Sequence, residues 1–363
     1  MSESRLEPLL LGQRVVAILE TGLRTATYKL GSLMALIDYA IEHVPDDPDA
    51  SVEVPIPDLA QRVLELYWRQ VRPFAGKELR QSTQARARIP RAAMELRAAA
   101  GIGTGGASLA VAATRAPTVY EKALDEVTLC LAQQPLQRLQ RLPGATVSDC
   151  FLFEDSFLHD HVSRSTLRAH GDSIVLGPGV ATGLARLAGL LKPALEIMWV
   201  EDVRRMNRFL DEDVPDVAGH LFGRERISLA SVREPFKDAF GARCFYCDLP
   251  LAVDNPVDHV LPWSLLGIDG LANLVLACRR CNGDKRHSLP ATSIVDRVLE
   301  RDRDVLEAIA AEIEWPTQFD RVVAAARGIY RSQPDGSVTW AGVRSSQRLD
   351  LAFPHWWLDI DPR

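Results

Sequence analysis

The most informative part of the chain begins with Cys244-Phe-Tyr-Cys247, continues through Val257-Asp258-His259-Val260 and Ala272-Asn273-Leu274, and closes with Cys278-Arg-Arg-Cys281-Asn282. Two Cys-x2-Cys pairs at this spacing are typical of a metal site in a reducing compartment. A module this short buries too little apolar surface to fold firmly, and four thiolates closing on Zn²⁺ supply the missing free energy. We therefore predict a structural zinc ion bound by Cys244, Cys247, Cys278 and Cys281.

The residues between and after the cysteine pairs predict a second metal ion. A zinc shell of four thiolates has no open position for water, so a different ion is needed for catalysis. Asp258, on an expected strand, and Asn282, at the start of an expected helix, offer the hard oxygen ligands that Mg²⁺ or Mn²⁺ prefers. We expect these two residues to bind a catalytic divalent ion, with water and phosphate oxygens completing its shell.

Together these motifs closely resemble the HNH endonucleases of the ββα-metal class, in the subgroup with a four-cysteine zinc site. The resemblance runs from Arg243 to Leu289 and includes the spacing His-x13-Asn-x8-Asn. It implies that His259 is the general base that activates the attacking water, and that Asn273 shapes the loop that holds this histidine. It also implies that Asn282 takes the third catalytic position, where many relatives carry histidine.

Basic residues around the second cysteine pair are candidates for substrate binding. Lys285 follows Asn282 by three residues and so shares its expected helix face, and three arginines, Arg279, Arg280 and Arg286, lie close by. We expect them to bind the substrate phosphate. The alternative, a solvated face of an exposed helix, stays open for each of them. His287 is a weaker candidate ligand, because it lies well off the Asn282 face.

These residues predict an enzyme that hydrolyses phosphodiester bonds, with DNA as the expected substrate and RNA as an open alternative. A single site of this kind cuts one strand, so a monomer is expected to nick. The alternative function is a zinc-binding adaptor for nucleic acid or protein that does not cut. An adaptor has no need for an Asp-His pair between the cysteine pairs or for asparagines at both matching positions, which favours the enzyme.

The composition is that of an ordinary folded protein, with 363 residues, 47% of them hydrophobic, and a net charge of −6. This acidic balance argues against a nonspecific nucleic-acid coat protein, which usually carries a basic excess. No apolar run approaches the roughly 20 residues of a membrane-spanning helix, and the start of the chain lacks the features of a secretory signal. We expect a cytoplasmic location. The two other cysteines, Cys130 and Cys150, are expected in the core.

Residues 62–97 carry nine Lys or Arg against three Glu. This basic segment either grips phosphates, with salt-sensitive affinity, or forms a helix face whose arginines pair with acidic groups elsewhere. The first alternative predicts a restriction-type or anti-phage effector that binds DNA through its N-terminal half. The second fits a module that docks on protein partners of a defence complex. A metal site at His159-Asp160-His161 and a phosphate loop at Gly101–Gly106 are both disfavoured, the first for want of a third ligand.

The whole chain predicts an α+β protein that is mainly helical. We expect a helical region over 1–110, a small mixed α/β region for targeting or regulation over 111–225, the zinc-stapled module over 226–298, and a helical extension over 299–363. Its aromatic residues, Trp340, Phe353, Trp356 and Trp357, are expected to dock on a core or a partner. Hydrophobic spacing predicts helices over 7–43 with a break near 25–28, and over 59–72, 118–142, 180–191, 192–211, 228–240, 299–313 and 319–332. Short strands are expected over 146–153 and 173–176.

Overall fold

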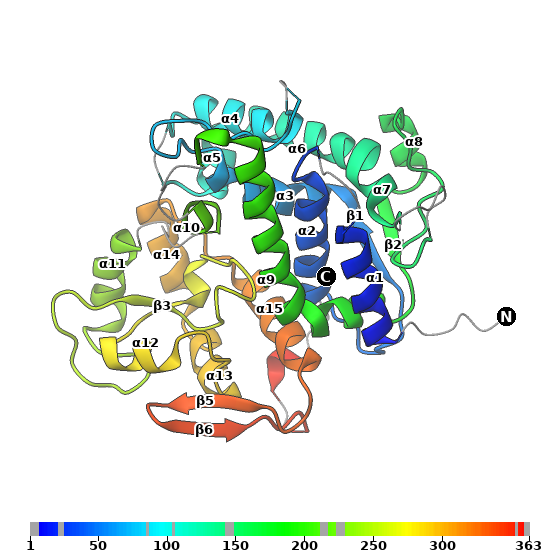
Figure 1. The fold of residues 1–363 in the computed structure, drawn as a ribbon. Helices are drawn as coiled ribbons and strands as arrows, with labels where there is room; N and C mark the ends of the chain where they lie inside the picture. Colours follow the sequence, from blue (N-terminus) through cyan, green and yellow to red (C-terminus); the bar gives the residue numbers. More distant parts are fainter. Residues whose placement is uncertain are drawn as a thin grey trace. The chain divides into compact units, whose positions relative to one another are not determined.

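A computed structural model describes residues 7–20, 25–84, 87–103, 106–141, 149–210, 217–222, 229–352 and 355–358. The chain divides into two compact units, one of Met1–Ala40 and Pro45–Ile227 and the other of Ile41–Val44 and Ser228–Arg363. Helices dominate both units, and every sheet within the described residues is a pair of antiparallel strands (Figure 1). The predicted class, α+β and mainly helical, is confirmed.

The first unit opens with helix α1 (Pro8–Glu20), most of α2 (Tyr28–Glu42), and α3 (Ile56–Gln70). The predicted break near 25–28 and the predicted helix over 59–72 are both confirmed. Helix α3 begins with a proline in its first turn, where the missing N–H costs nothing. Its buried residues recur every three or four positions and pack against α4 (Arg88–Ala99) and α6 (Pro117–Leu131). The short helix α5 (Leu109–Arg115) leads into α6.

The helix predicted over 118–142 is interrupted near its end. Helix α6 is followed by a π-helical turn, η1 (Ala132–Leu136), and by α7 (Gln137–Leu139). Pro135 lies inside that turn. A proline has no N–H for the usual bond and crowds the preceding turn, so one wider turn lets the chain continue in the same direction. Residue 142 lies outside the described residues.

One of the two predicted strands forms, and its partner comes from far away in the sequence. Strand β2 (Ser173–Leu176) pairs with β1 (Val52–Pro55), with Val54 opposite Ile174. The strand predicted over 146–153 does not form in its described part, because Cys150 has a positive φ of 45° that turns the chain. Only Phe153 in that part bridges to Leu176, and residues 146–148 lie outside the described residues. Cys130 is buried as predicted, but Cys150 is exposed.

After α8 (Arg164–Ala169) and β2, the chain forms the long helix α9 (Val180–Met206), followed by η2 (Arg208–Leu210) and α10 (Val217–Phe222). Two helices were predicted over 180–211, but α9 runs unbroken through Pro193. Pro193 has no N–H, so the Gly189 carbonyl one turn earlier lacks its usual helical hydrogen bond. Both residues are exposed, and water can therefore bind this carbonyl. Inside this unit, Trp199 of α9 packs on Tyr67 of α3 with ring centroids 5.3 Å apart.

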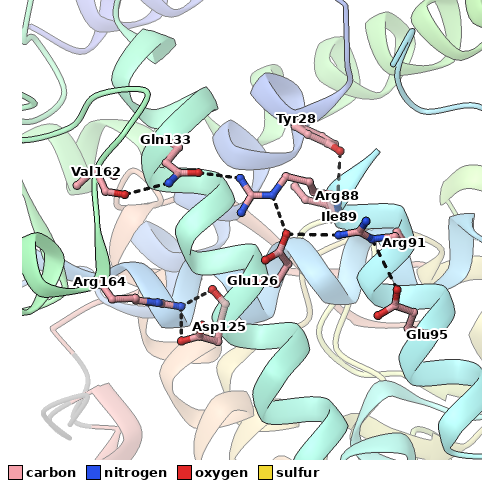
Figure 2. A network of polar contacts seen from close by, with 10 residues as sticks. All are labelled: Tyr28, Arg88, Ile89, Arg91, Glu95, Asp125, Glu126, Gln133, Val162 and Arg164. Carbon is pink, nitrogen blue, oxygen red and sulfur yellow. Dashed lines mark hydrogen bonds and ion pairs between the residues drawn. The ribbon is translucent and has the colours of Figure 1, made fainter. Parts of the chain in front are cut away.

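The basic segment of the first unit is tied to neighbouring groups (Figure 2). The Arg88 guanidinium donates to Glu126 at 2.7 Å and to Gln133 at 2.8 Å, so it links α4 to the helix α6 and to η1. Arg91 lies 3.6 Å from Glu95 and 3.7 Å from Glu126. For these arginines the structure supports pairing within the fold over phosphate binding.

Arg97 and Arg86 belong to the same basic segment. Arg97 is buried and donates to the carbonyl oxygens of Trp68 and Gly103. Arg86 lies outside the described residues.

Asp160, from the disfavoured His-Asp-His metal site, pairs with Arg138 at 2.6 Å. The other disfavoured site, Gly101–Gly106, lies partly outside the described residues.

The second unit contains α11 (Ala230–Phe240), β3 (Val257–His259), η3 (Leu271–Asn273), β4 (Leu274–Leu276) and α12 (Arg279–Lys285), then α13 (Thr292–Leu299), α14 (Arg303–Ile313), α15 (Phe319–Ser332), β5 (Val338–Gly342), β6 (Ser345–Arg348) and η4 (Trp356–Leu358). Its core joins Phe236 of α11, Val257 and Leu274 of the β3–β4 hairpin, and Leu306 and Ile309 of α14. The helices predicted over 228–240 and 319–332 are confirmed within the described residues, although residue 228 lies outside them.

The helix predicted over 299–313 forms as α14, but it begins four residues later, at Arg303. The preceding helix, α13, was not predicted. Helix α13 ends at Leu299, and α14 begins after Asp302, whose carboxylate accepts hydrogen bonds from the backbone N–H groups of Asp304 and Val305. An aspartate in this position stabilises the start of a helix, which explains why α14 begins at Arg303.

The aromatic extension packs onto the second unit. Trp357 is fully buried, lies edge-on to Tyr330 at 5.2 Å and donates to Asp296 at 2.7 Å. Trp340 of β5 is buried, and its indole N–H donates to Asp284 of α12 at 2.8 Å. Trp356 is exposed, and Phe353 lies outside the described residues. Two of the four predicted aromatic residues therefore dock within their own unit.

Candidate metal centre and active site

The four predicted zinc ligands converge on one point. The Sγ atoms of Cys244, Cys247, Cys278 and Cys281 all lie within 4.8 Å of one another. The Sγ atoms of Cys247 and Cys278 are 3.9 Å apart. Tetrahedral zinc with Zn–S bonds of about 2.3 Å places its sulfur atoms about 3.8 Å apart. The donor set and its spacing therefore fit a structural zinc ion.

Backbone N–H groups support this cluster of sulfur atoms. The N–H of Cys278 donates to the Cys244 sulfur at 3.3 Å, and the N–H of Cys281 donates to the Cys278 sulfur at 3.4 Å. Burial raises the pKa of the Cys244 thiol. At Cys278 burial has the same tendency, but the N–H of Cys281 and the neighbouring thiols outweigh it and lower the pKa. Cys278 is also the N-cap of α12, so the ligand and the helix start are one feature.

The module has the ββα arrangement expected from the resemblance. Strands β3 and β4 are antiparallel, with Asp258 opposite Val275 and His259 opposite Leu274. Helix α12 begins three residues after β4 ends. Asp258 and His259 are therefore consecutive on β3, Asn273 ends η3, and the partly exposed Asn282 lies on α12.

Asp258 is buried and held by two side chains. The hydroxyl of Tyr246 donates to its Oδ2 at 2.7 Å, and the Lys285 ammonium lies 3.2 Å from the same oxygen. Burial, and then the Asp258 charge, raise the pKa of Tyr246, so this hydroxyl keeps the proton that it donates. Both contacts engage one oxygen of the carboxylate.

The position of Lys285 corrects the prediction that it faces the substrate. Its side chain is 1% exposed, and its ammonium donates to the His259 carbonyl at 2.7 Å. The spacing of three residues from Asn282 could not distinguish the inner from the outer side of α12. Lys285 therefore joins α12 to β3, because it contacts the backbone of His259 and the side chain of Asp258.

His259 contacts a residue that the sequence did not single out. Its Nε2 lies 2.9 Å from Oδ1 of Asp269, and its side chain is only 3% exposed. Asp269 lies in the loop between β3 and η3. The sequence shows Asp269 simply as an acidic residue between the His and the Asn of the motif. An irregular loop has no periodicity from which the direction of its side chains could be predicted.

Asn273 is fully buried and braces that loop. Its side-chain oxygen accepts from the N–H of Leu261 at 2.8 Å, and its amide donates to the carbonyls of Leu261 and Ile268, both at 3.2 Å. These bonds join the two ends of the loop that follows His259. The geometry agrees with the loop-shaping role that the resemblance implies for Asn273.

Residues beyond the motif also hold this part of the module. The Arg301 guanidinium donates to the carbonyls of Leu271, Ala272 and Leu274 at 2.8 to 3.1 Å. Burial lowers the pKa of Arg301 to about 10. The Trp315 indole donates to the Asp269 carbonyl at 2.6 Å. No motif in the sequence pointed to these two residues.

The arginines predicted to bind substrate, Arg279, Arg280 and Arg286, are all exposed on or beside α12. Asp284 lies between them in sequence, and its pKa is lowered, first by the hydrogen bond from Trp340 and then by the N–H of Arg344. His287 is exposed and lies beyond the end of α12.

Family comparisons agree with this geometry. Residues 10–217, more than half of the chain, match the model of a domain of unknown function, DUF8808. The chain belongs to the DUF8808 family. Residues 244–288 match the HNH endonuclease family, so this DUF8808 protein carries an HNH module with a four-cysteine cluster. Searches of curated proteins and of solved structures gave no match. No described helix is long and apolar enough to cross a membrane.

Proposed function

We propose that this chain is a metal-dependent endonuclease that hydrolyses phosphodiester bonds in DNA. One observation carries the proposal. Asp258 and His259 lie side by side on β3 of an HNH module whose four cysteines cluster for zinc, and each has a different supporting partner. A zinc-binding adaptor has no use for a buried His-Asp pair beside a buried Asp-Lys pair, since each costs desolvation.

The side chains divide the chemistry between them. His259 takes the proton of the attacking water as general base. Asp258, whose Oδ2 is contacted by Tyr246 and Lys285, and Asn282 would hold Mg²⁺ or Mn²⁺. When bound, this ion supplies stabilisation of the negative charge that develops on the phosphate and the leaving oxygen. The four thiolates keep the structural zinc out of the reaction.

Substrate binding is proposed for the outer surface of α12. Arg279, Arg280 and Arg286 are exposed, and arginine guanidinium groups bind phosphate oxygens in pairs. With a net charge of −6, contact with nucleic acid is expected to be confined to this surface.

For the first unit, the pairing of Arg88, Arg91 and Arg97 within the fold favours docking on a protein partner over gripping DNA. We assign the chain to a bacterial restriction or anti-phage system in which this unit brings the nuclease to its target. Expression of the wild type, but not of His259→Ala, is then expected to reduce phage plating.

A substrate panel tests the proposed activity. Zinc-loaded protein is incubated with supercoiled plasmid, linear duplex, single-stranded DNA, or RNA of matching sequence, each with Mg²⁺, Mn²⁺ or EDTA. We expect supercoiled plasmid to become nicked with either metal and to stay intact in EDTA. Cleavage of RNA alone would change the substrate, and no cleavage of any of them would favour the adaptor.

A further inference from the structure

Asp269 is the acidic residue that reaches the His259 ring. Its Oδ1 lies 2.9 Å from Nε2, and the side chains are 15% and 3% exposed. Asp258 precedes His259 in the chain but turns to Tyr246 and Lys285, as expected for neighbouring residues on a strand. Asp269 belongs neither to the His-x13-Asn-x8-Asn pattern nor to the cysteine cluster.

The contact decides which ring nitrogen is available for chemistry. An ionised carboxylate only accepts hydrogen bonds, so Nε2 must carry the hydrogen, and in the neutral imidazole Nδ1 then carries the lone pair. We propose that Asp269 is a positioning residue that fixes the tautomer and the orientation of His259, so that Nδ1 acts as the base. The catalytic part of this proposal rests on the proposed nuclease function.

The protein holds Asp269 firmly in place. The Trp315 indole donates to its carbonyl at 2.6 Å. The next residue, Gly270, passes so close to the following segment that a Cβ there would lie 2.5 Å from the Thr317 carbonyl oxygen. The N–H of Leu271 donates to the Pro316 carbonyl at 3.0 Å.

These partners at 315–317 lie outside the residues 244–288 that match the HNH family. The extension after the module thus completes the support of the general base. A histidine that is almost fully buried has little freedom to turn by itself, and its direction follows from the groups that bond it. Asp269, fixed through its backbone on one side and bonded to the ring on the other, sets that direction.

The first test measures the tautomer and does not require activity. Full-length, zinc-loaded protein labelled with ¹⁵N-histidine is studied by NMR over a pH series, and the His259 signals are assigned by their loss in His259→Ala. We expect the Nε2–H tautomer in the wild type and a changed tautomer ratio in Asp269→Asn. An Nδ1–H tautomer in the wild type overturns the proposal, whether or not the chain cuts DNA.

The second test measures plasmid nicking by Asp269→Asn, Asp269→Glu and a matched control, Asp254→Asn, which changes an exposed acid of the same unit. We expect Asp269→Asn to lower kcat by about 100-fold, within the usual range for general base catalysis, with KM and thermal midpoint unchanged. Asp269→Glu is expected to restore part of the rate, and Asp254→Asn to behave as the wild type.

A double variant separates positioning from a structural role. If Asp269 acts through His259, adding Asp269→Asn to His259→Ala has no further effect on the residual rate. A further loss in that background, or a kcat of Asp269→Asn within twofold of the wild type, overturns the proposal. A wild type that fails to cut while His259 shows the Nε2–H tautomer overturns the proposed function and leaves the assigned geometry of the ring standing.

Discussion

The Lys285 ammonium lies 3.2 Å from Oδ2 of Asp258, and both side chains are buried. A buried pair is costly to break, because the partner that remains is an uncompensated charge. We predict that Lys285→Met lowers the free energy of unfolding of the second unit by about 3 to 5 kcal/mol. Denaturant unfolding of the zinc-loaded protein measures this loss.

Arg286→Ala is the matched control for Lys285→Met, since Arg286 is the next residue and is exposed. Its removal is expected to change stability by less than about 0.5 kcal/mol. Equal stability of the two variants would contradict the internal role of Lys285.

Gly270 is required by the close approach of two segments. A Cβ at this position would lie 2.5 Å from the Thr317 oxygen and 2.6 Å from Cβ of Gln318. Gly270→Ala must push these segments apart and is expected to destabilise the second unit by about 1 to 3 kcal/mol. Because Asp269 is adjacent, the nicking rate should also fall. Gly283→Ala on α12, which has open space at its Cβ, should be neutral or slightly stabilising. A Gly270→Ala variant as stable as the wild type would contradict this prediction, because it would show that the Thr317–Gln318 segment can move aside without cost.

We predict that Arg88 contributes to stability, whereas Arg280 contributes to DNA binding. Arg88 is partly buried and bonded to Glu126 and Gln133, so Arg88→Ala should cost about 1 kcal/mol of stability after allowance for solvent screening. DNA affinity should stay within twofold. Arg280 is exposed on α12, and Arg280→Ala should weaken DNA binding and reduce the slope of log affinity against log salt by about one. Fluorescence anisotropy across a salt series checks both, and a reversed pattern would return DNA binding to the first unit.

Zinc removal is expected to unfold the second unit while the first keeps its helices, because the two are separate compact units. A structural zinc site contributes on the order of 10 kcal/mol, as much as the whole stability of a typical domain. Cys281→Ser should abolish the bound zinc and part of the helical circular dichroism. Cys150→Ser, at an exposed cysteine that is not one of the four predicted ligands, should retain the zinc bound by those four cysteines, as elemental analysis measures. Full zinc in Cys281→Ser would refute the ligand set.

Local spacing explains what could be predicted from the sequence. Two Cys-x2-Cys pairs are enough to predict the four zinc ligands. One motif is enough to predict the positions of Asp258, His259 and Asn273. Amphipathic spacing was sufficient for α3 and α15, because each buries one face.

What could not be predicted depends on tertiary contacts. The partner of β2 comes from residues 52–55, more than a hundred positions earlier, and nothing local encodes such a pairing. Lys285 was assigned to the substrate because its spacing of three residues from Asn282 does not show which face of the helix meets β3. Asp269 lies in a loop whose direction is set by Asn273, Trp315 and Gly270 together. The contact with His259 appears only when these residues are brought together.

The initial rate of plasmid nicking with Mg²⁺ or Mn²⁺, compared between the wild type and His259→Ala, tests the central claim most directly. His287→Ala serves as the control, since His287 is an exposed histidine beyond α12. We predict that His259→Ala loses at least about 100-fold in rate while keeping its zinc, and that His287→Ala cuts as the wild type does. Undiminished nicking by zinc-loaded His259→Ala would contradict the assignment of this histidine as the general base.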